Sequence, residues 1–196
     1  DSRNGCKLFT RRDEPNLTIQ WSGRCVNGVA GGRGVANYLL GGTAFLRLEG
    51  DFRNGRPEGR ANLLVLSGHD KGQKYDGGFR DGKMDGMGSM VWANGDRYEG
   101  EWRDGLFDGR GILHYASGNR YEGEWRKGYR SGQGILVDEK KGNRYEGQWV
   151  NHFPNGYGVY TGFDGVVYRG QFINGCYRQG TGWAAVGKSP EDCGFR

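Results

Sequence analysis

The chain of 196 residues has little of what builds a conventional globular core. Apolar residues make up 35% of it, below the roughly 45–50% of ordinary domains. No run of 18 apolar residues occurs, which excludes a membrane-spanning helix of the usual length. With 4 prolines beside 40 glycines, the composition is not that of collagen. No stretch has helical apolar spacing long enough to predict a helix.

Cysteine is absent between Cys25 and Cys176. Four cysteines allow three pairings, of which the simplest is two local disulfides, Cys6–Cys25 and Cys176–Cys193. The spacings lack the close pairs of a zinc site, and no metal or cofactor is expected. Persistent disulfides indicate an oxidising compartment, and the chain begins at Asp1 rather than methionine. We therefore expect an exported protein, periplasmic or secreted, although a truncation explains the first residue equally well.

What the chain has is glycine together with 6 Trp, 11 Tyr and 9 Phe residues. This combination favours thin β structure, in which large rings fill the space that glycines leave. A five-residue pattern recurs in register, with starts at 21, 48, 75, 98, 121, 145 and 168. The period is 23 or 24 residues in the middle and 27 at the N-terminal end. The clearest copies are Tyr98-Glu99-Gly100-Glu101-Trp102, Tyr121-Glu122-Gly123-Glu124-Trp125 and Tyr145-Glu146-Gly147-Gln148-Trp149.

The pattern closely resembles the MORN repeat (membrane occupation and recognition nexus), over about residues 20 to 182. The resemblance implies an all-β fold, an elongated single-layer antiparallel stack of β-hairpins with about seven repeats. We expect an N-terminal cap segment over 1–18, the repeat domain over 19–183 and a C-terminal cap tail over 184–196. Departures cluster toward the ends, where capping repeats are atypical. Cys25 stands in place of an aromatic residue, Ala61 and His152 each stand in place of glycine, and the last repeat slips by one residue.

Each repeat is predicted to form a hairpin. Tyr98, Gly100 and Trp102 alternate with charged residues, which is typical of a strand with two unlike faces. The two residues that follow each such strand, an Asn or Asp and then a Gly, predict a tight turn that needs positive φ. They are Asn27-Gly28, Asn54-Gly55, Asp81-Gly82, Asp104-Gly105 and Asn174-Gly175.

The aromatic residues at the first and fifth positions are expected to form a continuous core, with rings lying over glycines of the next repeat. A curved stack would instead leave the rings in an open groove suited to a peptide or a sugar. We expect burial, because a single layer has no other core. The rings concerned are Tyr98, Trp102, Tyr121, Trp125, Tyr145 and Trp149.

Charged residues stack into outward columns, in the order basic, acidic, acidic, basic along each strand. One interpretation is a solvated face whose charges compensate each other and keep a long sheet soluble. The other is a ligand face for a partner's charged groups or for anionic lipid headgroups. The candidate basic positions are Arg97, Arg120 and Arg144 before the motif, and Arg103 and Arg126 after it.

Nothing in the sequence predicts catalysis. The stretch from Gly182 to Ser189 matches the phosphate-loop pattern, but no βαβ context surrounds it and Pro190 follows at once. We expect a non-catalytic repeat scaffold that binds a protein partner through an extended β surface. The alternative is peripheral binding of anionic phospholipid headgroups through the Arg/Lys columns. No nucleic-acid partner is expected, since basic residues have acidic neighbours. An open sheet edge offers a route to a homodimer.

Overall fold

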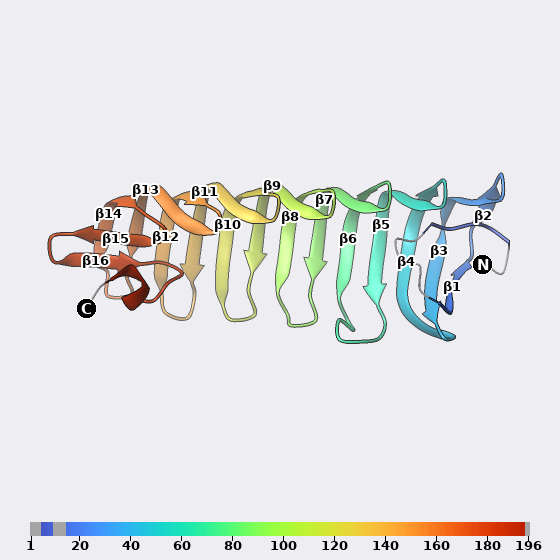
Figure 1. Cartoon of the computed structure of the whole chain (residues 1–196), viewed down its shortest axis with the longest axis horizontal. Helices are drawn as coiled ribbons and strands as arrows, with labels where there is room; N and C mark the ends of the chain where they lie inside the picture. Colours follow the sequence, from blue (N-terminus) through green and yellow to red (C-terminus); the bar gives the residue numbers. More distant parts are fainter. Residues whose placement is uncertain (1–4, 10–14, 195–196) are drawn as a thin grey trace. The chain divides into compact units, whose positions relative to one another are not determined.

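A computed structural model describes residues 5–9 and 15–194, so Asp1 and parts of the two predicted caps lie outside the described residues. The chain divides into two compact units, Asp1–Leu106 and Phe107–Arg196. This division falls within the repeat domain predicted over 19–183. The N-terminal unit holds β1 (Leu17–Trp21), β2 (Arg24–Val26), β3 (Val29–Leu40), β4 (Thr43–Arg53), β5 (Arg56–Val65), β6 (Lys74–Arg80), β7 (Lys83–Val91) and β8 (Arg97–Arg103) (Figure 1).

The C-terminal unit holds β9 (Leu106–His114), β10 (Asn119–Arg126), β11 (Tyr129–Asp138), β12 (Asn143–Val150), β13 (Phe153–Thr161), β14 (Val167–Phe172), β15 (Cys176–Gln179), β16 (Gly182–Ala185) and a short 3₁₀ turn, Glu191–Cys193. The strand order is β1-β3-β4-β5-β6-β7-β8 in the first unit, with β2 on β3, and β9-β10-β11-β12-β13-β14 in the second. All these pairings within the units are antiparallel. The prediction of an all-β stack of antiparallel hairpins is confirmed.

The tight turns adopt the backbone that the sequence predicts. Asp81 and Gly82, for example, have φ of 48° and 76°. Positive φ at both central residues is the type I′ geometry, which matches the twist of the flanking strands. The other four predicted turns have positive φ at both residues as well. Glycine is therefore needed here for its conformation, whereas strand glycines with ordinary φ, such as Gly77 and Gly88, serve packing.

The core of the repeats that start at Tyr75, Tyr121 and Tyr145 is a tyrosine ring that covers two facing glycines. A Cβ added at Gly77 or Gly88, which pair across β6 and β7, would lie 2.4 or 2.3 Å from the Tyr75 hydroxyl oxygen. That hydroxyl donates a hydrogen bond to the Gly78 carbonyl at 3.0 Å, and the equivalent hydroxyl of Tyr121 donates to Glu124. The tyrosines thus cover glycines of their own repeat, not of the next one as expected.

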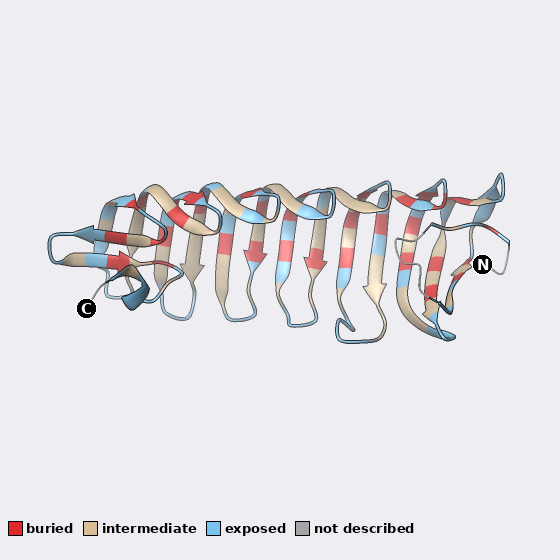
Figure 2. Cartoon of the chain, in the orientation of Figure 1, coloured by how far each residue is buried: buried red, intermediate tan, exposed pale blue. Residues whose placement is uncertain are grey.

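The second aromatic residue links consecutive repeats. Trp149 donates its indole N–H to the Gly134 carbonyl of the preceding repeat at 3.0 Å. Its ring also meets Tyr121 edge to face, with centroids 5.2 Å apart. In the N-terminal unit Trp102 contacts Tyr75 in the same way, at 5.3 Å. Buried positions alternate along the strands as this packing requires (Figure 2).

One turn has no glycine at its second central position. His152 has φ of 75° at the position that glycine fills in the other turns. Its Nδ1 accepts the backbone N–H of Arg130 at 3.3 Å, and its ring lies 5.0 Å from that of Tyr129. Burial, and after it the charge of Arg130, lowers the pKa of His152 below its ordinary value of 6.5. The neutral imidazole, which can accept the Arg130 N–H, is thus the form that folding favours.

We expect acid to weaken this turn. Because the folded-state pKa of His152 is depressed, its contribution to stability is present above about pH 6.5 and lost as pH falls through the folded-state pKa. The melting temperature should fall a few degrees further between about pH 7.5 and pH 5.5 in the native protein than in His152→Asn, which tolerates positive φ but does not titrate. Equal falls measured by circular dichroism would rule out this role for His152.

The two ends are closed by disulfides between Cys6 and Cys25 and between Cys176 and Cys193. These are the local pairs expected as the simplest of the three, and they are compatible with an oxidising, exported environment. The last repeat does not continue the sheet as a regular hairpin. Instead β15 and β16 form a separate two-stranded sheet, in agreement with the one-residue slip in the glycine pattern.

Candidate functional site

Three outward arginines pair with a glutamate on their own strand. Arg120 contacts Glu122 at 2.6 Å and Arg144 contacts Glu146 at 2.6 Å, each two residues apart. In the N-terminal unit, Arg47 contacts Glu49 at 2.8 Å. Pairs this exposed contribute little stability, about 0–1 kcal/mol. The arginines are therefore electrically compensated and still free to exchange partners.

A groove of about 450 Å³ lies on this outward face of the C-terminal unit. Strands β9, β10, β11 and β12 contribute to it. Its lining is Arg110, Gly111, Ile112, Glu122, Gly123, Glu124, Gln133, Gly134, Ile135 and Glu146. Three carboxylates face one guanidinium, so the lining itself is acidic although the surrounding strands carry arginines.

The strand register explains how apolar and acidic groups come together. Glu122 on β10 is paired with Ile112 on β9 and with Ile135 on β11. Glu146 on β12 is paired with Ile135 from the other side. Each isoleucine is half-buried and each glutamate exposed. Glu124 is held in place because its carboxylate accepts the Gln133 backbone N–H at 2.9 Å.

The apolar character continues beyond the groove on β13. Val159 is paired with Glu146, so it follows Ile112 and Ile135 in the same row. Two residues before it, Tyr157 is 56% exposed. Side chains two apart on a strand share a face. The outward face of this unit therefore offers a row of aliphatic side chains beside carboxylates.

The aromatic part of the predicted binding surface is not accessible. Tyr98 and Tyr121 are 0% exposed, and Tyr145 is 1% exposed. The tryptophans are buried too, at 6% for Trp102, 4% for Trp125 and 2% for Trp149. These six rings are core, so the alternative of an open aromatic groove is wrong and the expectation of burial holds.

The basic part of that surface is accessible to different degrees. Arg97 and Arg103 are exposed residues at the two ends of β8 in the N-terminal unit. In the C-terminal unit, Arg126 is exposed at the end of β10, while Arg120 and Arg144 are half-buried beside their glutamates. Sequence reasoning missed Ile112 and Ile135. Their signal was the alternation of Ile112 with Gly111 and Leu113 on the return strand.

The described residues offer no candidate site for a metal ion, no membrane-spanning helix and no phosphate loop followed by an α-helix. No group of three or more His, Cys, Asp or Glu side chains there could hold a metal ion. No helix in the same residues is long and apolar enough to cross a membrane. The phosphate-loop match is split between β16 and the residues before the 3₁₀ turn, so no α-helix follows it within the described part of the chain.

Comparison with known proteins agrees with this architecture. The family model for the MORN repeat matches residues 49–61, 75–97, 98–120, 121–141 and 145–167, together just over half of the chain. The matches run from within β4 to the start of β14 and leave out the first repeat and the last one, which starts at 168. No curated protein matches the chain.

Proposed function

Since the chain belongs to the MORN repeat family, whose repeats are generally non-catalytic scaffold or binding repeats, we propose that it binds a protein partner through the outward face of the C-terminal unit. The observation that supports this proposal is the groove itself. It combines half-buried isoleucines with exposed carboxylates on adjacent strands. Repeat proteins commonly bind their partners through extended surfaces.

The lining supports a particular chemistry for the proposed partner segment. Aliphatic side chains would pack on Ile112 and Ile135, which removes apolar surface from water. Lysine or arginine side chains would pair with Glu122 and Glu146 in place of the exposed contacts to Arg120 and Arg144. The expected partner is thus a basic, aliphatic segment of a protein.

Binding of anionic phospholipid headgroups is the competing function, and the ion pairs disfavour it. A headgroup phosphate would have to draw Arg120 or Arg144 away from a carboxylate two residues along the strand. It would also meet Glu124 within the same groove. Like charges brought together in this way cost affinity.

Paired charge variants separate the two functions. We expect twelve-residue peptides selected on the purified protein by phage display to be rich in Lys or Arg and in aliphatic residues. Their affinity should fall about tenfold or more in Glu122→Gln/Glu146→Gln and change little in Arg120→Gln/Arg144→Gln. Titration calorimetry at two salt concentrations measures this directly.

The lipid function predicts the opposite dependence. Flotation with phosphatidylserine vesicles that is lost in Arg120→Gln/Arg144→Gln, but strengthened in the glutamate variant, would replace the protein-partner proposal. Selected peptides that are acidic, or whose binding survives Ile112→Ser/Ile135→Ser, would also contradict it. The charge variants change only exposed glutamates or half-buried arginines in surface ion pairs, so folding should be preserved.

A further inference from the structure

The N-terminal unit contains a larger cavity, of about 650 Å³, where the repeat pattern breaks. The repeat that starts at position 48 has Leu48 in place of the tyrosine and Ala61 in place of a glycine. Ala61 faces Gly50 across β4 and β5, at the place where Gly88 faces Gly77 in the next repeat. A leucine there is shorter than the ring it replaces. The missing ring therefore leaves room over the sheet.

The same repeat is also longer, and its added residues form one wall of the cavity. The period here is 27 instead of 23, and residues 66–73 connect β5 to β6. Ser67, Gly68, His69 and Asp70 line the cavity. The Leu66 N–H donates to Phe45 and the Gly72 N–H to Val65, both at 2.9 Å. The wall is thus a formed element of the fold.

The floor of the cavity is aliphatic and its rim is electrically balanced. Leu46, Leu48, Leu63 and Val65 line it from β4 and β5. At the rim, Arg56 pairs with Asp81, and Lys83 pairs with Asp104 at 2.6 Å. An apolar molecule fits this floor, but an anionic head would find the rim cations already paired.

The lining contains one tyrosine hydroxyl, that of Tyr38. Tyr38 is 7% exposed, and its hydroxyl has no hydrogen-bond partner among the described residues. The tyrosines of later repeats, such as Tyr75 and Tyr145, donate theirs to carbonyls within 3.1 Å. Burial raises the pKa of Tyr38 to about 12, so the hydroxyl is a donor at neutral pH. The hydroxyl oxygen is not one of the fully buried unpaired atoms of the described residues, so it is open to solvent, and a ligand that supplies an acceptor can take the place of water there.

We propose that this cavity binds a neutral single-chain amphiphile, with its aliphatic tail on the leucine and valine floor and a carbonyl oxygen that accepts the Tyr38 hydroxyl. The volume of about 650 Å³ lies within the range of roughly 300–1,000 Å³ that small-molecule sites occupy. A fatty acyl ester has this chemistry. The site lies in the other unit from the partner groove and does not depend on it.

Methyl decanoate is the ligand to test, in competition with the fluorescent apolar probe N-phenylnaphthylamine. We expect the ester to displace the probe, and decanoate, which carries a charge, to be at least about tenfold weaker because the described rim cations, Arg56 and Lys83, already have carboxylate partners. Tyr38→Phe should weaken the ester about fivefold to tenfold, the effect of one hydrogen bond. Failure of the ester to displace the probe, or equal affinity for decanoate, would overturn the proposal.

Two further variants distinguish binding from folding. Tyr75→Phe removes a hydroxyl that already has its acceptor, so it should lower stability and leave ester affinity unchanged. Leu48→Tyr/Ala61→Gly restores the repeat pattern and fills the cavity with a ring. It should abolish ester binding while melting at or above the native temperature. Undiminished ester binding in this double variant would place the ligand elsewhere and refute the assignment.

Discussion

Replacement of Gly134 by alanine is expected to destabilise the C-terminal unit by about 3 kcal/mol, the upper part of the range for overpacked cores. The added Cβ would lie 2.4 Å from the Tyr121 hydroxyl oxygen and 2.7 Å from two of its ring carbons. The Tyr121 ring is held by contacts on several sides. Its hydroxyl donates to Glu124 at 3.0 Å, and its faces and edge meet the Arg130 guanidinium and the Trp149 ring.

The effect at Gly134 should be steric, not conformational, because its backbone lies outside the positive-φ region. Gly182→Ala on β16 is the matched control. It also has an ordinary backbone, and its nearest neighbour would be a Tyr168 ring carbon at 3.1 Å. Urea denaturation followed by circular dichroism should show a large shift for the first variant and a small one for the second. Equal shifts would show that the strand glycines act through the backbone instead.

The break in the repeat pattern at Leu48 and Ala61 suggests how the loss could be rescued. There the alanine is accommodated because no ring covers it. Tyr121→Leu should therefore be much less harmful in the Gly134→Ala background than alone, which a double-mutant cycle measures as a coupling energy. Additive losses would mean that the ring and the glycine do not act as a pair.

The fold could be predicted because the residues of each repeat determine its strands and turns locally. The alternation from Tyr121 to Trp125 sets the two faces of a strand, and the turn residues, such as Asp104-Gly105, set where it reverses. Seven copies in register make a chance match improbable. The end of the stack was harder, because the glycine slip near Gly180 does not say whether the last hairpin joins the sheet or, as observed, forms its own.

The candidate site was harder to predict for a physical reason. The motif lies on one strand of each hairpin, and its charged residues dominate the outward face in the sequence. The groove depends equally on the return strand, whose Ile112 and Ile135 follow no shared motif. Cross-strand register alone brings them beside Glu122. The cavity over Leu48 is harder still, since it arises from a ring that is missing.

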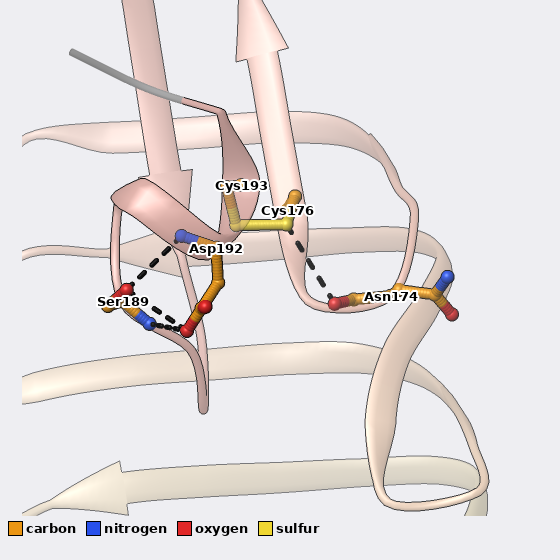
Figure 3. Close-up of a disulfide and its surroundings, with 5 residues drawn as sticks. All are labelled: Asn174, Cys176, Ser189, Asp192 and Cys193. Carbon is orange, nitrogen blue, oxygen red and sulfur yellow. Dashed lines mark hydrogen bonds between the residues drawn. A yellow bond between two sulfur atoms is a disulfide. The ribbon is translucent and has the colours of Figure 1, made fainter.

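The second large effect is expected at the C-terminal disulfide. β15 and β16 form a two-stranded sheet of their own, and an isolated hairpin is marginally stable in water. The bond from Cys176 to Cys193 joins β15 to the 3₁₀ turn across a sequence separation of 17 (Figure 3). Closing a loop of this size stabilises by about 3 kcal/mol in the chain-entropy account. The disulfide is thus a covalent constraint on this end of the chain, beside the packing of Tyr177 on Phe172.

A local network supports the bond without replacing it. The Ser189 hydroxyl donates to the Asp192 carboxylate at 3.0 Å, and the Asp192 N–H donates back to that hydroxyl at 3.2 Å (Figure 3). Hydrogen bonds from the Ser189 N–H and hydroxyl hold the pKa of Asp192 below its ordinary value. These groups are exposed, so the network alone is weak compared with the covalent link.

Cys176→Ser/Cys193→Ser should therefore lose order locally and not globally. Amides of β15 and β16 should exchange about 100-fold faster with deuterium, the ratio that corresponds to about 3 kcal/mol, while amides of β10 to β12 stay protected. Ser189→Ala, which keeps the disulfide, should change exchange in β15 and β16 far less. In the native protein, thiol titration before reduction should find no free thiol among the four cysteines. Free thiols there would contradict both the pairing and export to an oxidising compartment, because a stabilising disulfide of this kind persists only where thiols are not kept reduced.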